Sequence, residues 1–178
     1  SYGKGDKKDE PRISISARVC ADALEAAGAD RMVTMDLHAP QIQGFFSIPV
    51  DNLYALPVFC ERMRQEAPED LIVVSPDAGF VKQARRYASE LGTSVAIADK
   101  VRPSHEAEAE VLQLIGDVEG MTALVVDDFA ISGGTLTGVA ELLMERGARR
   151  VYAAVSHAVL AEEAAERIDS SPIHRLFV

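Results

Sequence analysis

The residues best suited to chemistry lie in one short stretch, residues 125–138, which reads VVDDFAISGGTLTG. Its apolar residues stop at two adjacent carboxylates, Asp127 and Asp128, and a turn with two glycines and flanking hydroxyls follows at residues 131–135. A glycine turn that leads into a helix offers unpaired backbone N–H groups and partial positive charge, which suit a phosphate monoester. Because carboxylates would repel that phosphate, we expect them to face sugar hydroxyls or a divalent cation. The stretch therefore predicts a phosphorylated-sugar site, and the alternative is a helix capped by Ser132 or Thr135 beside two solvated aspartates.

Polar residues also follow the other apolar runs of the chain. They are Asp36 and His38, then Asp77, then Asp99, Lys100 and Arg102, and finally His157. Ligands of a parallel sheet collect at the carboxyl ends of its strands, so five such endings on one sheet edge would form one site. Taken alone, His38 could be a structural histidine and Asp77 could form an Asx turn. Lys100 and Arg102 could be solvated charges of a polar loop.

Strand-like and helix-like segments alternate between these endings. Continuous apolar runs predict strands at 31–39, 71–75, 93–100, 122–128, 150–157 and 174–178. Helical spacing predicts helices at 14–29, 54–67, 81–92, 135–148 and 161–169, and the polar stretch 101–110 is expected to be a loop that can move. The pattern indicates an α/β fold, with a parallel sheet covered by helices on both faces. The break at residues 51–57 suggests a domain boundary.

Composition limits the classes of function. With 178 residues, 48% of them hydrophobic, the chain can bury the core of one domain or of one domain and part of another. A net charge of −10 argues against non-specific nucleic-acid binding, and no apolar run approaches the ~20 residues of a membrane span. Cys20 and Cys60 lack metal-ligand spacing, which favours a reducing cytoplasm.

Residues 125–138 resemble the phosphoribosyl pyrophosphate-binding motif of the type I phosphoribosyltransferase fold. Four further blocks are similar, in the same order, to the ribose-phosphate pyrophosphokinase (phosphoribosyl pyrophosphate synthetase) family. They are TMDLHAPQIQGFFSIPVDNLYA (34–55), SPDAG (75–79), DKVRP (99–103) and IGDVEG (115–120). The resemblance covers essentially the whole chain. It implies tandem phosphoribosyltransferase-like domains, with residues 1–53 the C-terminal part of an incomplete first domain and residues 54–178 a second domain truncated at its end.

The resemblance also implies an activity and its residues. The family transfers the diphosphoryl group of ATP to ribose 5-phosphate, which gives 5-phosphoribosyl 1-diphosphate and AMP, requires Mg²⁺ and forms homo-oligomers, commonly hexamers. Catalysis is expected from Lys100 and Arg102, and metal binding from His38 and Asp77. ATP would be bound by Lys4, Gly5, Asp6 and His38. Ribose 5-phosphate would be bound by Asp127, Asp128, Ile131, Ser132, Gly133, Gly134, Thr135 and Arg102.

Some positions depart from the pattern of the family. They are Lys4-Gly5 in place of Arg-Gln, Phe80 in place of a glycine, Gln83 in place of an arginine, Val101 in place of the middle arginine of Lys-Arg-Arg, and Ile131 in place of an aspartate. Because the outer cations, the metal ligands and the glycines are kept, we expect a variant with altered nucleotide contacts. A non-catalytic regulatory homologue and a type I phosphoribosyltransferase remain as alternatives.

Overall fold

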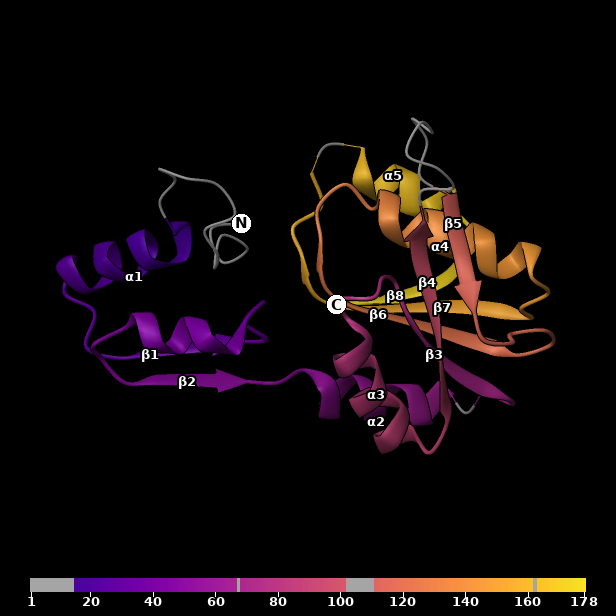
Figure 1. Cartoon of the computed structure of the whole chain (residues 1–178), viewed down its shortest axis with the longest axis horizontal. Helices are drawn as coiled ribbons and strands as arrows, with labels where there is room; N and C mark the ends of the chain where they lie inside the picture. Colours follow the sequence, from indigo (N-terminus) through magenta and orange to yellow (C-terminus); the bar gives the residue numbers. More distant parts are fainter. Residues whose placement is uncertain (1–14, 67, 102–110, 162) are drawn as a thin grey trace. The chain divides into compact units, whose positions relative to one another are not determined.

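The computed structural model describes residues 15–66, 68–101, 111–161 and 163–178 (Figure 1). The chain divides into two compact units, Ser1–Ala55 and Leu56–Val178. None of the helices in the described ranges is long and apolar enough to cross a membrane.

The first unit contains a two-stranded parallel sheet with two helical segments. Its elements are α1 (Ser16–Ala26), β1 (Met32–Met35), the 3₁₀ helix η2 (Pro40–Phe45) and β2 (Val50–Leu53). Helix α1 ends where the sequence predicts, since Gly28 adopts a φ of 96° and the Ala29 N–H donates to the Leu24 carbonyl. A small core of Ala17, Ala39 and Ile42 is flanked by Phe45 and Phe46. Both phenylalanines are partly buried against this core.

The second unit is built on a six-stranded sheet of order β5-β4-β3-β6-β7-β8. The strands are β3 (Leu71–Ser75), β4 (Ser94–Val101), β5 (Val111–Ile115), β6 (Thr122–Ala130), β7 (Arg150–Ala158) and β8 (Ile173–Phe177). The helices are α2 (Leu56–Glu66), α3 (Val81–Leu91), α4 (Gly134–Glu145) and α5 (Ala164–Asp169). Figure 1 shows α2 and α3 on one side of the sheet and α4 and α5 on the other. The predicted α/β fold with a mostly parallel sheet is confirmed.

The core of this unit lies between the sheet and α4. Helix α4 buries Leu136, Val139, Ala140 and Leu143, which share one face because they follow helical spacing. Strands β6 and β7 are buried at every position from 122 to 126 and from 151 to 155, as expected for strands covered on both faces. The glycine stretch therefore follows a strand that is buried in the middle of the sheet.

Three expectations need correction. Strand β1 pairs with β2 in the separate sheet of the first unit, so Asp36 and His38 do not lie on the edge of the large sheet. Strand β5 was not predicted, and it pairs antiparallel with β4. Val101 is the last residue of β4 and not part of a loop, while residues 102–110 of the predicted loop lie outside the described residues.

Candidate functional site

The glycine stretch is a short turn between the end of β6 and the start of α4. Strand β6 does not stop at the two aspartates as predicted but continues to Ala130, because its pairing with β7 extends as far as Ala130↔Ala158. The turn then spans three residues, and α4 begins at Gly134. The loop therefore starts from a backbone held by a neighbouring strand.

Gly133 is required in this turn for two reasons. Its φ of 72° is in the left-handed region, which residues with a side chain rarely adopt. A Cβ at this position would also lie 3.1 Å from Cγ1 of Ile168, a buried residue of α5. The loop thus closes tightly against α5.

The amino terminus of α4 has the features that suit an anion. Its N-cap is Gly133, and no described side chain caps it. Ser132 and Thr135 therefore do not occupy the capping position that the alternative interpretation requires. The Gly134 N–H points at Ser132 Oγ across a long 3.4 Å, and the first turn contains no acidic residue. Backbone N–H groups and helix dipole together favour an anion here.

Two carboxylates lie together beside this loop, and a third, Asp77, lies within electrostatic reach of one of them. The Asp128 N–H donates to Asp127 Oδ1 at 2.8 Å, and Asp128 is 9% exposed. Burial, and after it the negative charges of Asp128 and then Asp77, together raise the pKa of Asp127 to about 7. The described ends of β3 and β6 therefore bring Asp77, Asp127 and Asp128 close enough to interact. A carboxyl group with a raised pKa in a polar cluster is typical of a functional site.

Asp77 shapes the turn after β3. Its Oδ1 accepts the Phe80 N–H at 2.9 Å, and its carbonyl accepts the Ser75 hydroxyl at 2.7 Å. A Cβ at Gly79 would lie 3.2 Å from the same Oδ1, so a glycine leaves this carboxylate room. Asp77 thus forms the Asx turn through its Oδ1, and its Oδ2 would remain for a metal ion. Among the described residues no three acidic, histidine or cysteine side chains are arranged to hold a metal ion.

The other half of the predicted metal pair lies in the first unit. His38 is exposed and follows Asp36, whose backbone has a φ of 43°. Asp36 Oδ2 accepts the Ala55 N–H at 3.0 Å, so this carboxylate fixes the turn after β1. His38 and Asp77 belong to different units, and each is described within its own unit.

Some of the remaining predicted site residues lie in strands, and others lie outside the described residues. Lys100 lies within β4, where its backbone pairs with Leu112 of β5, so it is part of a hairpin strand and not of a loop. Asp99 precedes it in the same strand. His157 lies in β7 opposite Phe129, with ring centroids 5.8 Å apart. The positions Lys4, Gly5, Asp6 and Arg102 lie outside the described residues.

One residue near the loop was missed by the sequence analysis. Nη1 of Arg167, on α5, lies 3.4 Å from the point that a Cβ of Gly134 would occupy. Residues 161–169 were predicted only as a short helix, and no sequence signal links them to the loop. Arg167 lies near Gly134 because α5, which follows β7, packs against the glycine loop through Ile168.

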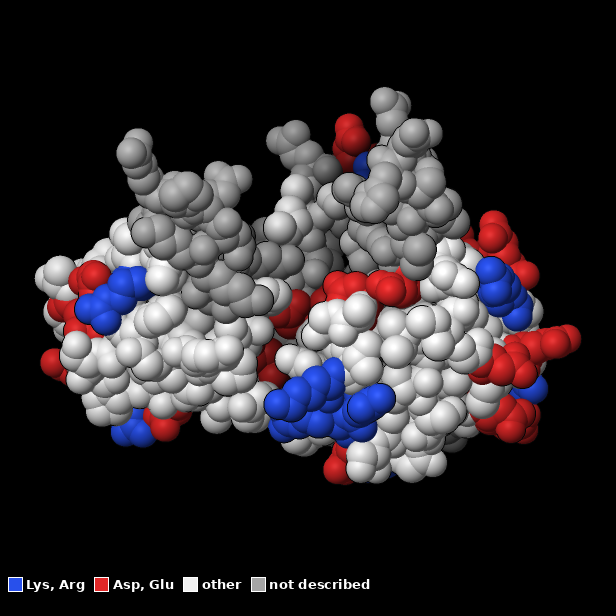
Figure 2. Space-filling model, in the orientation of Figure 1, with Lys and Arg blue, Asp and Glu red and all other residues white. Residues whose placement is uncertain are grey.

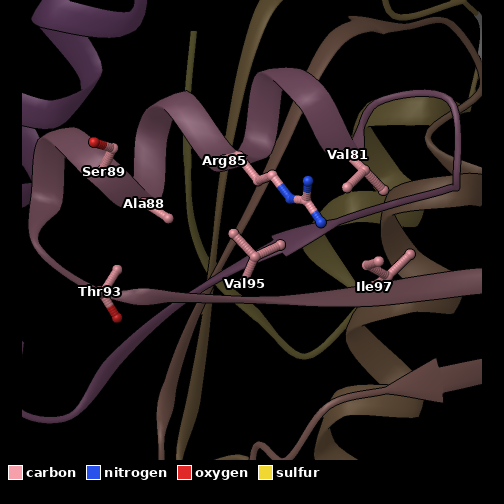
Figure 3. A pocket seen from close by; sticks show the side chains of 7 residues that line it. All are labelled: Val81, Arg85, Ala88, Ser89, Thr93, Val95 and Ile97. Carbon is pink, nitrogen blue, oxygen red and sulfur yellow. The ribbon is translucent and has the colours of Figure 1, made fainter.

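A hollow of about 420 Å³ lies elsewhere on the second unit, between α3 and β4 (Figure 3). It is lined by Val81, Arg85, Ala88, Ser89, Thr93, Val95 and Ile97, none of which is a predicted site residue. Figure 3 shows Arg85 extending over the hollow from α3, with Val95 and Ile97 on the strand opposite. Residues of this α3–β4 hollow therefore do not contribute to the glycine-loop site.

Comparison with known proteins agrees with this geometry. The phosphoribosyl transferase domain family matches residues 59–173, which include β3, β6, the glycine loop and α5. A ribose-phosphate pyrophosphokinase of Chlorobaculum tepidum is 47% identical over 178 residues, covering 99% of this chain and 55% of that protein. The enzyme of the same name from Burkholderia pseudomallei is 48% identical, with 99% and 56% covered. The chain thus spans about half the length of the curated relatives that it matches.

Solved structures give the same result. A phosphoribosylpyrophosphate synthetase from Mycobacterium smegmatis superposes with a TM-score of 0.90 at 39% identity, covering 98% of this chain and 57% of that one. A purine phosphoribosyltransferase from Pyrococcus horikoshii, at 22% identity and a TM-score of 0.51 over 68% of this chain and 78% of that one, shares the fold. The resemblance to ribose-phosphate pyrophosphokinases is confirmed, and the chain belongs to the phosphoribosyl transferase domain family.

Proposed function

We propose that this chain carries the ribose 5-phosphate site of a ribose-phosphate diphosphokinase. The observation that carries the proposal is the uncapped glycine turn at the start of α4, directly after Asp127 and Asp128. The turn suits the 5-phosphate, while the carboxylates accept hydrogen bonds from the ribose hydroxyls. Relatives named ribose-phosphate pyrophosphokinase at 44–48% identity support the choice of substrate.

In this proposal the anomeric oxygen of the bound sugar attacks the β-phosphorus of ATP, the bond to the α-phosphate breaks and AMP leaves. The proton of the anomeric hydroxyl is lost in the same reaction. Binding the sugar at both its phosphate and its hydroxyls fixes the direction of the anomeric hydroxyl, and such positioning is a large part of catalysis. Lys100 and Arg102 would stabilise the charge on the phosphoryl group in transfer.

Mg²⁺ is the cofactor that the proposal requires. Carboxylate oxygens fit a hard cation, and Asp77 within electrostatic reach of the half-buried Asp127 would supply them. His38 and Asp77 would hold the ion, which neutralises phosphate charge when it is bound. ATP would be bound by Lys4, Gly5, Asp6 and His38. Residues 1–53 would be the C-terminal part of a first domain and residues 54–178 a second domain.

The test is formation of AMP from ATP and ribose 5-phosphate by the complete protein. A diphosphokinase forms AMP without a nucleobase, whereas a phosphoribosyltransferase needs a nucleobase and releases diphosphate. Absence of both activities would contradict the proposal. We further propose a cytoplasmic homo-oligomer, a hexamer by resemblance, which sedimentation of the complete protein would test.

A regulatory homologue without activity is the second candidate. It is favoured by Ile131, which is 41% exposed in the loop where the family has an aspartate. Gln83 also favours it, because its Oε1 is buried without a hydrogen-bond partner among the described residues, where an arginine is common. Such a protein would raise the activity of a synthetase when mixed with it and form no AMP alone.

A further inference from the structure

Arg167 places a positive charge at the glycine loop from outside the binding motif. Its Nη1 is 3.4 Å, and Ser132 Oγ 3.6 Å, from the position of a Cβ on Gly134. A guanidinium and a hydroxyl therefore both reach the first residue of α4. The loop itself contributes backbone amides and hydroxyls but no cationic side chain.

The helix that carries Arg167 is fixed against the loop. The neighbouring Ile168 is 7% exposed, and its side chain fills the space beside Gly133. The carbonyl of Ala164 lies 3.5 Å from the same hypothetical Cβ position of Gly133. The base of the arginine side chain is thus held by packing, so its place beside the loop is part of the fold.

The charges of this arrangement suit an anion, and the exposed side chain of Arg167 is accessible to one. The amino terminus of α4 carries partial positive charge, so a cation next to it is unfavourable unless a negative group lies between them. The first turn of α4 supplies no acidic residue, and the Arg167 guanidinium forms no ion pair with another described residue. Six of the eleven arginines in the described ranges form ion pairs with carboxylates, and these are Arg18, Arg31, Arg62, Arg64, Arg149 and Arg175.

We propose that Arg167 binds the phosphate group of the sugar phosphate together with the amides of residues 132–135, and so selects phosphorylated over unphosphorylated sugars. The inference rests on the proposed function. An arginine suits this role, because its planar fork can donate two hydrogen bonds to one phosphate. The phosphate does not react, and the loop amides still position it when Arg167 is replaced. Loss of the Arg167 contact should therefore raise KM far more than it lowers kcat.

The experiment uses the complete protein with Arg167→Gln, Arg167→Lys and a matched control, Arg146→Gln. Arg146 is an exposed arginine at the other end of α4. Arg167→Gln should raise KM for ribose 5-phosphate about 10- to 100-fold with kcat within about twofold, since a hydrogen bond to a charged group is lost. The KM of Arg167→Lys should lie between those of the wild type and Arg167→Gln, because lysine keeps the positive charge but cannot donate two parallel hydrogen bonds as a guanidinium does. The control should match the wild type in KM, and all thermal midpoints should stay close.

Calorimetric binding of ribose 5-phosphate separates this inference from the proposed function. If the wild type forms AMP and Arg167→Gln keeps the wild-type KM, the role of Arg167 is wrong and the activity stands. If the wild type forms no AMP but binds ribose 5-phosphate in an Arg167-dependent manner, the activity is wrong and the role stands. A large fall in the thermal midpoint of both Arg167 variants, with an unchanged binding constant, would show that the arginine only supports the fold.

Discussion

Asp127→Asn should stabilise the metal-free protein at neutral pH while it reduces activity. Burial and two neighbouring carboxylates raise the pKa of Asp127 from 3.8 to about 7. The folded state therefore binds this proton more tightly than the unfolded state. Stability is highest below the unfolded pKa, falls as the pH rises toward the folded pKa and is level above it. Asparagine keeps the shape and the acceptor for the Asp128 N–H without the charge.

The size of the effect follows from the shift. One pKa unit corresponds to about 1.4 kcal/mol, so a shift of about three units is worth up to ~4 kcal/mol. We therefore expect a gain of about 2–4 kcal/mol for the variant at about pH 8. The difference between variant and wild type should shrink by about 1.4 kcal/mol for each pH unit from about pH 6.5 down to about pH 5.

The assay is urea unfolding across this pH range with a chelator present, so that no cation neutralises the carboxylates. Asp169→Asn, an exposed aspartate of α5, is the matched control and should show no such dependence. A difference between Asp127→Asn and the wild type that does not change with pH would refute the argument that burial raises this pKa. The same variant should lose at least about tenfold in AMP formation, because it removes a charged acceptor for the ribose hydroxyls.

Other positions give independent tests. Gly133→Ala should destabilise the second unit by about 1–3 kcal/mol in urea unfolding, because the φ of Gly133 is 72° and a Cβ would meet Ile168. The same variant should lose ribose 5-phosphate binding. The control Gly44→Ala should lower the free energy of unfolding far less, because no atom lies within 4 Å of its Cβ position. Lys100→Ala should lower turnover of the complete protein by about 100-fold or more if its charge stabilises the transferring phosphoryl group, and a loss of only a few-fold would remove that role. Amide hydrogens of β1 and β2 should exchange faster than those of β6 and β7, because a two-stranded sheet is marginally stable; equal protection in the two sheets would contradict this expectation.

Much of the second unit could be predicted because burial leaves a simple mark on the sequence. Strands covered on both faces read as continuous apolar runs, as in β3, β6 and β7. Helix α4 shows its buried face through the spacing of Leu136, Val139 and Leu143. The glycine turn could be located because a positive φ next to a helix start favours glycine.

The features that could not be predicted depend on pairing and packing partners, which the local sequence pattern does not reveal. The five-residue strand β5 is defined by its antiparallel pairing with β4, and its sequence, VLQLI, has no feature that distinguishes it from the start of a helix. Strands β1 and β2 form a sheet of their own, which the alternation of strands and helices could not reveal. Arg167 reaches the loop only because Ile168 packs on Gly133, a contact between residues with no shared motif.

The extension of β6 past its two aspartates bears on the proposal that this turn binds a sugar phosphate. Register with β7 fixes Asp127 opposite Val155 and Phe129 opposite His157, so the backbone between the carboxylates and the turn is held in a sheet. The glycine turn is fixed separately, by α4 behind it and by α5 beside Gly133. The distance between the hydroxyl acceptors and the anion site is therefore set by a strand and not by a loop. A strand advances about 3.3 Å per residue, and neighbouring residues such as Asp127 and Asp128 face opposite sides. Removing one residue between Asp128 and Ile131 would shorten this distance and exchange the sides that the two aspartates face relative to the turn. A rigid separation of this kind selects ligands by length, which suits a pentose that carries its phosphate at one end and its hydroxyls at the other.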